Sequence, residues 1–248
     1  MKFSVGNISV HVADNYEEMS VLAANMMAAQ ILFKPTSVLG LATGSTPVGL
    51  YNELSKKHKS GILDFSQVTT FNLDEYYPIK QANDQSFYYF MYDNLFKHIN
   101  IPKENINIPN GEAADIQHEC KTYEEKLRAA GIDMQLVGIG NNGHIGFNEP
   151  ADSFADSTFM VELTQSTIEA NSRFFNDISE VPAKAVTMGM GSVMTAKRIL
   201  FVANGTQKAD AVKKMLYGEI TPQMPASALR LHRKVDMFIT KEIYDQLQ

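Results

Sequence analysis

The stretch Leu136-Val-Gly-Ile-Gly-Asn-Asn-Gly-His-Ile-Gly-Phe-Asn-Glu-Pro150 combines a buried-strand signal, a glycine-rich turn and a tightly spaced polar cluster. Its apolar beginning, within residues 134–139, predicts a central strand, and the glycines that follow let the backbone turn and approach a ligand. Asn142, His144 and Glu149 leave that turn together. Histidine exchanges a proton near neutral pH, and a carboxylate five residues later can fix its tautomer if the loop curls back. We therefore predict an active-site loop.

The glycine spacing G-x-G-x-x-G across residues 138–143 also matches the dinucleotide-binding fingerprint, and Glu162 lies roughly where that fingerprint places its ribose-binding acid. The match is weak, because the fingerprint needs a helix that opens at the glycines, and Gly146 and Pro150 leave no room for one. A buried structural role is the other alternative for His144. The neighbouring glycines and the nearby carboxylate favour chemistry instead.

The composition indicates a globular protein large enough to bury a full core. The chain has 248 residues, of which 44% are hydrophobic and 20% are charged, and it contains no low-complexity tract, repeat or linker. We therefore expect a single domain that spans residues 1–248. The formal net charge of −6 argues against nucleic-acid binding through a large basic face, although it leaves room for a local anion pocket.

The single cysteine, Cys120, excludes an intramolecular disulfide and favours a reducing compartment. The N-terminus lacks the apolar core of a signal peptide, and Asn25 and Gln30 interrupt the longest apolar helical segment, residues 21–33. We therefore expect a cytoplasmic protein without a membrane partner.

Strands and helices alternate along the chain. Residues 8–12 predict a strand followed by a helix at 15–33, and residues 37–41 and 48–59 repeat this pattern. Such alternation predicts an α/β fold with a mostly parallel sheet covered by helices on both faces. Further strands are expected at 68–72, 106–108, 134–139, 157–162, 184–188, 198–203 and 235–240, and further helices at 85–96, 115–130, 164–175, 206–217, 226–231 and 241–247.

Small hydroxyl residues and a glycine occupy the strand-to-helix turn Ala42-Thr-Gly-Ser-Thr-Pro47. The backbone N–H groups of such a turn can wrap around an anion at the positive end of the following helix. An ordinary capped turn is the alternative. The candidate anion ligands are Thr43, Gly44, Ser45 and Thr46.

Two more polar clusters follow the ends of predicted strands. Asp74 and Glu75 lie among aromatic residues, and apolar surroundings can raise the pKa of a carboxylate toward the range of a general base. The alternative interpretation is that both are solvated loop acids without a catalytic role. Lys208, in the first turn of a predicted helix, opposes the helix dipole, and either a bound anion or simple solvation explains it. Ligands bind beyond the carboxyl ends of parallel strands, so we expect these clusters to meet.

Five motifs are spread over nearly the whole chain: Leu39-Gly-Leu-Ala-Thr-Gly-Ser-Thr-Pro47, Phe71-Asn-Leu-Asp-Glu-Tyr76, residues 138–150, Ala170-Asn-Ser-Arg-Phe-Phe175 and Gly205-Thr-Gln-Lys208. Together they resemble the glucosamine-6-phosphate deaminase/isomerase family, of the non-allosteric type. The pair F-N-x-D-E-Y and N-G-H-I-G-F-N-E-P is specific, because the related 6-phosphogluconolactonases lack the N-E-P ending. The resemblance implies a Rossmann-like α/β domain.

The reaction that this resemblance implies converts glucosamine 6-phosphate and water into fructose 6-phosphate and ammonia, with no metal or redox cofactor. The role of the base that moves a proton between adjacent sugar carbons falls on Asp74. The proton shuttle that opens the sugar ring falls on His144, supported by Glu149. The grip on the substrate phosphate falls on residues 43–46, Arg173 and Lys208.

One position departs from a common form of the motif. Asn142 stands where many members carry an aspartate two residues before the histidine. An asparagine cannot take up a proton, but it can accept a hydrogen bond from the imidazole. We therefore expect Asn142 to orient His144 and assign the charge-pairing role to Glu149 alone.

Two alternative functions come from other classes. A lactonase acting on a phosphorylated sugar lactone would need His144 but no carbon base at Asp74. A non-catalytic sugar-phosphate sensor is the second alternative, and the absence of a DNA-binding segment and the negative net charge count against it.

The sequence also predicts simple kinetics. Some members of the family are hexamers activated by N-acetylglucosamine 6-phosphate through basic residues just after the N-E-P loop, whereas residues 157–162 here contain no arginine or lysine and Asp152 and Asp156 lie nearby. We expect a monomer or small homo-oligomer with hyperbolic kinetics. The check is to titrate this effector into the assay while measuring the mass in solution. Sigmoidal rates that the effector makes hyperbolic would refute the expectation.

Overall fold

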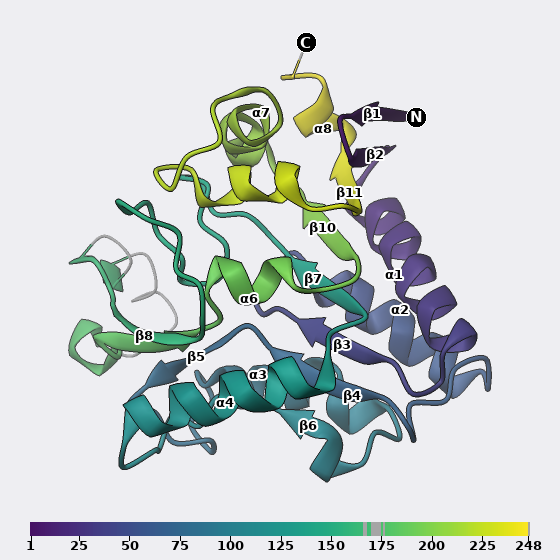
Figure 1. Cartoon of the computed structure of the whole chain (residues 1–248). Coiled ribbons are helices and arrows are strands. Elements are labelled where there is room, and N and C mark those ends of the chain that lie inside the picture. The colour runs from purple at the N-terminus through teal and green to yellow at the C-terminus, as the bar shows by residue number, and fades with distance from the viewer. Residues whose placement is uncertain (166–167, 170–174, 176, 248) are drawn as a thin grey trace.

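The computed structural model describes residues 1–165, 168–169, 175 and 177–247 (Figure 1). Within these residues the main feature is a sheet of eight strands in the order β1-β2-β11-β10-β7-β3-β4-β6. All neighbouring strands pair in parallel except β1 and β2, which are antiparallel. The strands are β1 (Lys2–Val5), β2 (Ile8–Ala13), β3 (Val38–Leu41), β4 (Thr69–Asn72), β6 (Ile106–Asn107), β7 (Met134–Val137), β10 (Ile199–Ala203) and β11 (Val235–Thr240).

The central strands are buried along their whole length. Every residue of β3, β7 and β10 is buried, as expected for parallel strands covered on both faces. These strands carry continuous apolar runs in the sequence, which is why their positions could be predicted. The mostly parallel sheet is confirmed, whereas β1 was not predicted.

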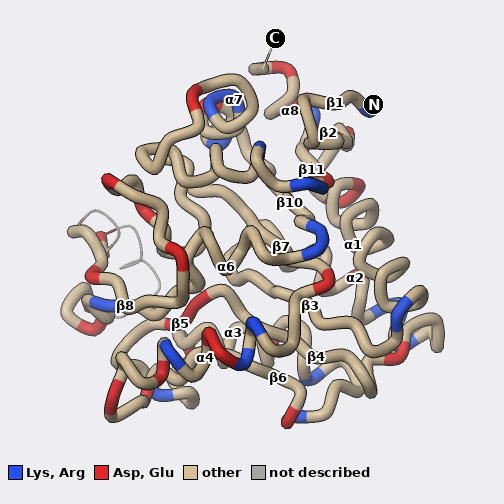
Figure 2. The backbone as a smooth tube through the Cα atoms, in the orientation of Figure 1, with Lys and Arg blue, Asp and Glu red and all other residues tan. Residues whose placement is uncertain are grey.

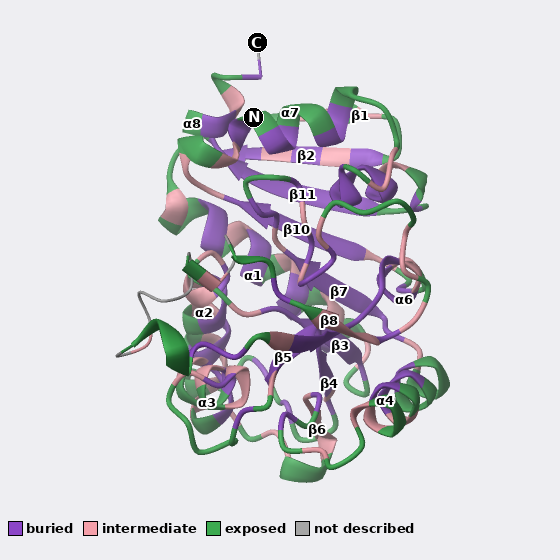
Figure 3. Cartoon of the chain, turned by 90° about the vertical axis from the view of Figure 1, so that its left-hand side faces the viewer, coloured by how far each residue is buried: buried purple, intermediate pink, exposed green. Residues whose placement is uncertain are grey.

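Helices cover both faces of the large sheet. Viewed from the side in Figure 3, α1 and α2 lie on one face, and α4 and α6 lie on the other. Side-chain caps begin several of them, since Asn15 accepts from the backbone N–H of Glu18 and Asp115 accepts from those of Gln117 and His118. The helices are α1 (Tyr16–Phe33), α2 (Val48–Lys59), α3 (Phe87–Asn94), α4 (Ile116–Ala130), α6 (Met190–Met194), α7 (Ala209–Tyr217) and α8 (Lys241–Tyr244).

A second, antiparallel sheet is the main departure from the predicted fold. It consists of β5 (Asp74–Tyr77), β9 (Lys184–Thr187) and β8 (Phe159–Glu162), and β5 occupies residues past the end of a predicted strand, where no further strand was predicted. The strand expected at 184–188 exists, but it joins this small sheet rather than the parallel one. Local alternation of residues indicates a strand without indicating its partner, so the sequence could not separate the two sheets.

Charged residues of both signs are interspersed over the helices and loops (Figure 2). Within the described part of the chain, no helix combines the length and the apolar character needed to span a bilayer. Cys120 lies buried on α4, and its thiol is free.

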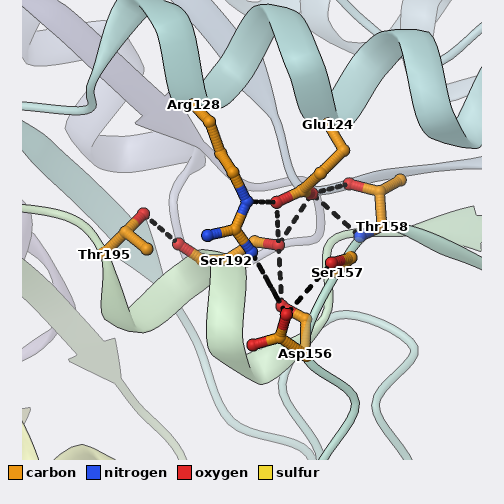
Figure 4. Close-up of polar contacts among 7 residues, drawn as sticks. All are labelled: Glu124, Arg128, Asp156, Ser157, Thr158, Ser192 and Thr195. Carbon is orange, nitrogen blue, oxygen red and sulfur yellow. Dashed lines mark hydrogen bonds and ion pairs between the residues drawn. The ribbon is translucent and has the colours of Figure 1, made fainter.

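A buried polar network ties α4 and α6 to the chain between the active-site loop and β8 (Figure 4). The carboxylate of Glu124 accepts hydrogen bonds from the backbone N–H and the hydroxyl of Thr158, at 2.8 and 2.7 Å, and from the hydroxyl of Ser192 at 2.9 and 2.8 Å. Arg128 pairs with the same carboxylate from its outer side. Burial opposes ionisation of Glu124, but the bonds from Thr158 and Ser192 outweigh it and hold the pKa of Glu124 below its ordinary value.

The network predicts an asymmetric response to mutation. The change Glu124→Ala leaves the N–H and the hydroxyl of Thr158 without a buried acceptor, while the hydroxyl of Ser192 keeps the carbonyl of Asp156 at 3.2 Å. We therefore expect the free energy of unfolding to fall by about 2–4 kcal/mol. The change Arg128→Ala removes a side chain that is 42% exposed, and its expected cost is about 1 kcal/mol or less. Urea unfolding of both variants measures the difference. Equal losses would show that the ion pair, rather than the buried acceptor, stabilises this region.

Candidate active site

The candidate residues lie on loops and strand ends that meet at the carboxyl edge of the parallel sheet. Residues 43–46 connect β3 to α2, and Asn142, His144 and Glu149 lie in the loop that follows β7. Asp74 begins β5 directly after β4, and Lys208 ends a short 3-10 turn between β10 and α7. Because parallel strands end at the same edge of a sheet, four segments far apart in the sequence contribute to one region.

His144 has one ring nitrogen held and the other free to react. Its Nδ1 lies 2.8 Å from Asn142 Oδ1 and 3.4 Å from Glu149 Oε1. Both partners are acceptors, since the amide of Asn142 donates its Nδ2–H to Glu149 Oε2 at 2.6 Å. The proton of a neutral ring therefore resides on Nδ1, which leaves Nε2 as a base. The side chain is 36% exposed, so a ligand can reach it.

Glycines in the loop allow two close approaches. A Cβ atom on Gly140 would lie 2.1 Å from Cε1 of His144, so only glycine lets the ring fold back over its own loop. Gly146 has a φ of +58°, and a Cβ there would lie 3.0 Å from Oδ2 of Asp74. Gly146 therefore brings the histidine loop against β5. No helix opens between residues 138 and 150, as expected, which removes the structural basis for dinucleotide binding there.

Asp74 is a buried acid. Its exposed fraction is 5%, and burial, followed by the charge of Glu75, raises its pKa from 3.8 to about 8. Tyr51 on α2 and Tyr123 on α4 lie close enough for the charge of Asp74 to raise the pKa of their phenols, after the larger effect of burial. An acid with this proton affinity can accept a proton from a weakly acidic carbon.

Hydrogen bonds from two other segments fix the turn between β3 and α2. Gly44 has a φ of +101°, which glycine adopts without strain. The hydroxyl of Tyr16 donates to the carbonyl of Ser45 at 3.0 Å and accepts from the N–H of Gly49 at 2.8 Å. The hydroxyl of Thr46 donates to Oδ1 of Asn204 at 2.8 Å. Asn204 immediately precedes Gly205, so this bond joins the turn to the segment that carries Lys208.

Lys208 is partly buried, and its ammonium group donates to the carbonyl of Ile139 at the start of the histidine loop. Desolvation lowers the pKa of Lys208 from its ordinary value. A lysine held in this way, on the segment that Thr46 contacts through Asn204, can serve as a point charge for a phosphate. Arg173, the other predicted phosphate ligand, lies outside the described residues.

Sequence reasoning missed Tyr16 and Asn204. The hydroxyl of Tyr16 acts 29 positions away and the amide of Asn204 acts 158 positions away, so no local pattern marks them. Thr187 was also missed, although its hydroxyl accepts from the N–H of Phe147 at 3.2 Å and thereby ties the histidine loop to β9. Among the described residues, no group of three or more His, Cys, Asp or Glu side chains could hold a metal ion.

Comparison with known proteins identifies the family of the chain. A family model for "Glucosamine-6-phosphate isomerases/6-phosphogluconolactonase" matches residues 13–238. The glucosamine-6-phosphate deaminase of Clostridium botulinum (strain Kyoto / Type A2) is 56% identical over 237 residues, which are 95% of this chain and 97% of that protein. The glucosamine-6-phosphate deaminase of Clostridioides difficile (strain 630) is 54% identical over 239 residues, 96% of each chain.

Solved structures extend the comparison to the fold. A monomeric glucosamine-6-phosphate deaminase superposes with a TM-score of 0.92 at 44% identity, covering 96% of this chain and 99% of its own. A 6-phosphogluconolactonase from Thermotoga maritima superposes with a TM-score of 0.76, covering 94% of this chain and 100% of its own, but at 20% identity it shows the fold alone. With the family model spanning most of the chain and relatives above 50% identity, the chain belongs to the family of glucosamine-6-phosphate isomerases and 6-phosphogluconolactonases.

Proposed function

We propose that this protein is a glucosamine-6-phosphate deaminase that converts glucosamine 6-phosphate and water into fructose 6-phosphate and ammonia. One observation carries the proposal: a buried acid of raised pKa, Asp74, lies against the loop in which His144 is held by Asn142 and Glu149. Ring opening needs a proton shuttle and isomerisation needs a carbon base, and this arrangement supplies one group for each. The relatives at 54–56% identity carry the same activity in their names.

In the proposed reaction, Nε2 of His144 takes the proton from the anomeric hydroxyl and returns it to the ring oxygen, which opens the sugar. Asp74 then moves a proton from C2 to C1 of the open chain, while the aldehyde oxygen gains a proton and the amine at C2 loses one. The resulting imine at C2 is hydrolysed by water, which releases ammonia and leaves a ketone. Asn142 and Glu149 hold the proton on Nδ1 of His144, so Nε2 alone exchanges protons with the substrate.

The phosphate is proposed to bind where the turn at residues 43–46 meets Lys208. The bond from Thr46 to Asn204 supports this assignment because it brings the two segments together. Arg173 completes the proposed set on the basis of its motif. We further propose that residues 1–248 act as one domain, as a monomer in the cytoplasm. The monomeric relative at 44% identity supports the oligomeric part.

A lactonase is the second candidate, and Asp74 argues against it. Hydrolysis of a lactone needs a water activated by His144 but no proton transfer between carbons. The 6-phosphogluconolactonases that superpose on this chain are 18–20% identical, so they bear on its fold and not on its activity. Ammonia release from glucosamine 6-phosphate by the purified protein, compared with hydrolysis of 6-phosphogluconolactone, decides between the two.

The activity of an Asp74 variant tests the proposed carbon base. Asp74→Asn removes the proposed carbon base and preserves its size, so we expect turnover to fall about 10²–10⁴-fold with substrate binding largely intact. Ammonia release measures turnover, and equilibrium titration with the substrate measures binding. The control is Asp84→Asn, an exposed loop acid, which should behave as the parent. Near-normal turnover in Asp74→Asn would sink the assignment.

The same variant makes a second, opposite prediction for stability. Because the pKa of Asp74 is raised from 3.8 to about 8 in the folded protein, its contribution to stability is present below pH 4 and is lost as pH rises through 8. Asparagine cannot ionise, so Asp74→Asn should be more stable than the parent at pH 9 by at least about 1 kcal/mol, or roughly 2–4 °C in melting temperature. At pH 5 the difference should shrink. A variant that is less stable at pH 9 would contradict the buried, raised-pKa acid.

Lys208→Ala tests the phosphate site. We expect weaker binding of glucosamine 6-phosphate and little change in the binding of unphosphorylated glucosamine, because only the former presents a dianion to the ammonium group. Lys213→Ala, on the exposed face of α7, is the matched control. Equal losses for both sugars, or no loss for either, would mean that Lys208 is not a phosphate ligand.

A further inference from the structure

Glu75 is a buried acid that the proposed reaction does not use. It follows Asp74 on β5, and the alternation of a strand places the two side chains on opposite faces. Only 2% of Glu75 is exposed, although ionised side chains at such depth are costly unless they are paired or strongly hydrogen-bonded. A buried Glu75 therefore needs an interaction that offsets its desolvation.

The compensating interaction is the N-terminus of α3. Oε1 of Glu75 accepts from the N–H groups of Tyr76 at 2.9 Å and Phe87 at 2.8 Å, and Oε2 accepts from the N–H of Tyr88 at 2.8 Å. Phe87 and Tyr88 are the first two residues of α3, whose N–H groups have no partner inside the helix. Ser86 caps the next N–H, that of Tyr89, at 2.9 Å. The positive end of the helix therefore holds the negative charge of Glu75.

Asp74 has no comparable support. Among the residues that the structure describes, none donates a hydrogen bond to its carboxyl group. Among the described residues, the titratable groups coupled to it electrostatically are Glu75 and Tyr76 on its own strand, Tyr51 on α2 and Tyr123 on α4. The histidine loop, which carries His144 and Glu149, also packs against it at Gly146. The three tyrosines are neutral because burial raises each phenol pKa, and Glu75 is the charged group that raises the pKa of Asp74.

The two carboxyl groups consequently ionise in order. Burial raises the pKa of Glu75 to about 7, less than it would without the three N–H donors, whereas the pKa of Asp74 rises to about 8. As pH increases, the helix-bound carboxyl of Glu75 loses its proton first. The charge that it acquires then opposes loss of the second proton, from Asp74.

We propose that Glu75 is a positioning residue for the deaminase reaction: the N-terminus of α3 fixes its negative charge beside Asp74, and that charge strengthens Asp74 as the carbon base. The inference rests on the proposed function for the role of Asp74, while the electrostatic coupling of the two acids stands on the geometry alone. A stronger base takes a proton from carbon more readily, which raises the maximal rate, but it also becomes protonated at a higher pH. Glu75 would thus set both the height and the acidic limit of the pH–rate profile.

The kinetic test is the pH dependence of kcat/KM for Glu75→Gln with glucosamine 6-phosphate. Without the fixed charge, we expect the acidic limb to move to lower pH by about one unit and the plateau to fall by about three- to tenfold. Ser86→Ala is the matched control. It removes another acceptor at the same helix end without changing charge, so it should lower the melting temperature and leave the limb in place. An active, folded Glu75→Gln protein with an unmoved limb would overturn the proposal.

A second measurement holds even if Glu75→Gln fails to fold. In the parent protein labelled with ¹³C at its carboxyl carbons, Glu75 should lose its proton at a lower pH than Asp74, whose signal is identified by its loss in Asp74→Asn. The reverse order would overturn the proposal. This titration needs no turnover, so it tests the role of Glu75 separately from the proposed deaminase function. Absence of ammonia release by the parent protein refutes the function, whereas the order of ionisation tests Glu75 itself.

Discussion

The backbone of Leu73 joins the two sheets, and the site depends on this junction. Its N–H donates to the carbonyl of Leu41 at 2.9 Å, which continues the pairing of β4 with β3, and its carbonyl accepts from Met188 at 2.8 Å, which continues the pairing of β5 with β9. One residue thus ends a parallel ladder and begins an antiparallel one. Asp74 follows immediately, so its carboxyl is buried where the carboxyl edge of the large sheet meets the small sheet.

The small sheet also positions the histidine loop. Thr187 pairs with Asp74 between β9 and β5, and its hydroxyl accepts a hydrogen bond from the backbone N–H of Phe147. Phe147 packs against Tyr76 with ring centroids 5.7 Å apart. The aromatic contact and the hydrogen bond fix the far end of the loop, while its near end leaves β7 in the middle of the parallel sheet. A loop anchored at both ends holds His144 in one geometry at little further entropic cost.

The site stores unfavourable energy that the rest of the fold offsets. Two adjacent acids are buried, and burial raises the pKa of each. The surrounding core is apolar, whereas elsewhere in the described chain buried acids have cationic or hydroxyl partners. Asp133 accepts from Lys34 at 2.6 Å and from Lys197 at 2.8 Å, and Glu124 accepts from Thr158 and Ser192. The contrast separates acids that stabilise the fold from a pair whose proton affinity burial raises, a property that suits the role proposed for Asp74.

The amino-acid sequence by itself determined most strands and helices of the parallel sheet, because continuous apolar runs and helical periodicity are local signals. It also located the loop of His144, the turn at residues 43–46 and Lys208, since glycines, hydroxyls and charges at strand ends follow from the chain order. Only the tertiary structure decided that β5, β8 and β9 form a separate sheet, that Asn204 contacts Thr46, and that Glu75 caps the N-terminus of α3. These features depend on which distant segments become neighbours. That choice is made by the packing of the whole core, and no short window of sequence contains it.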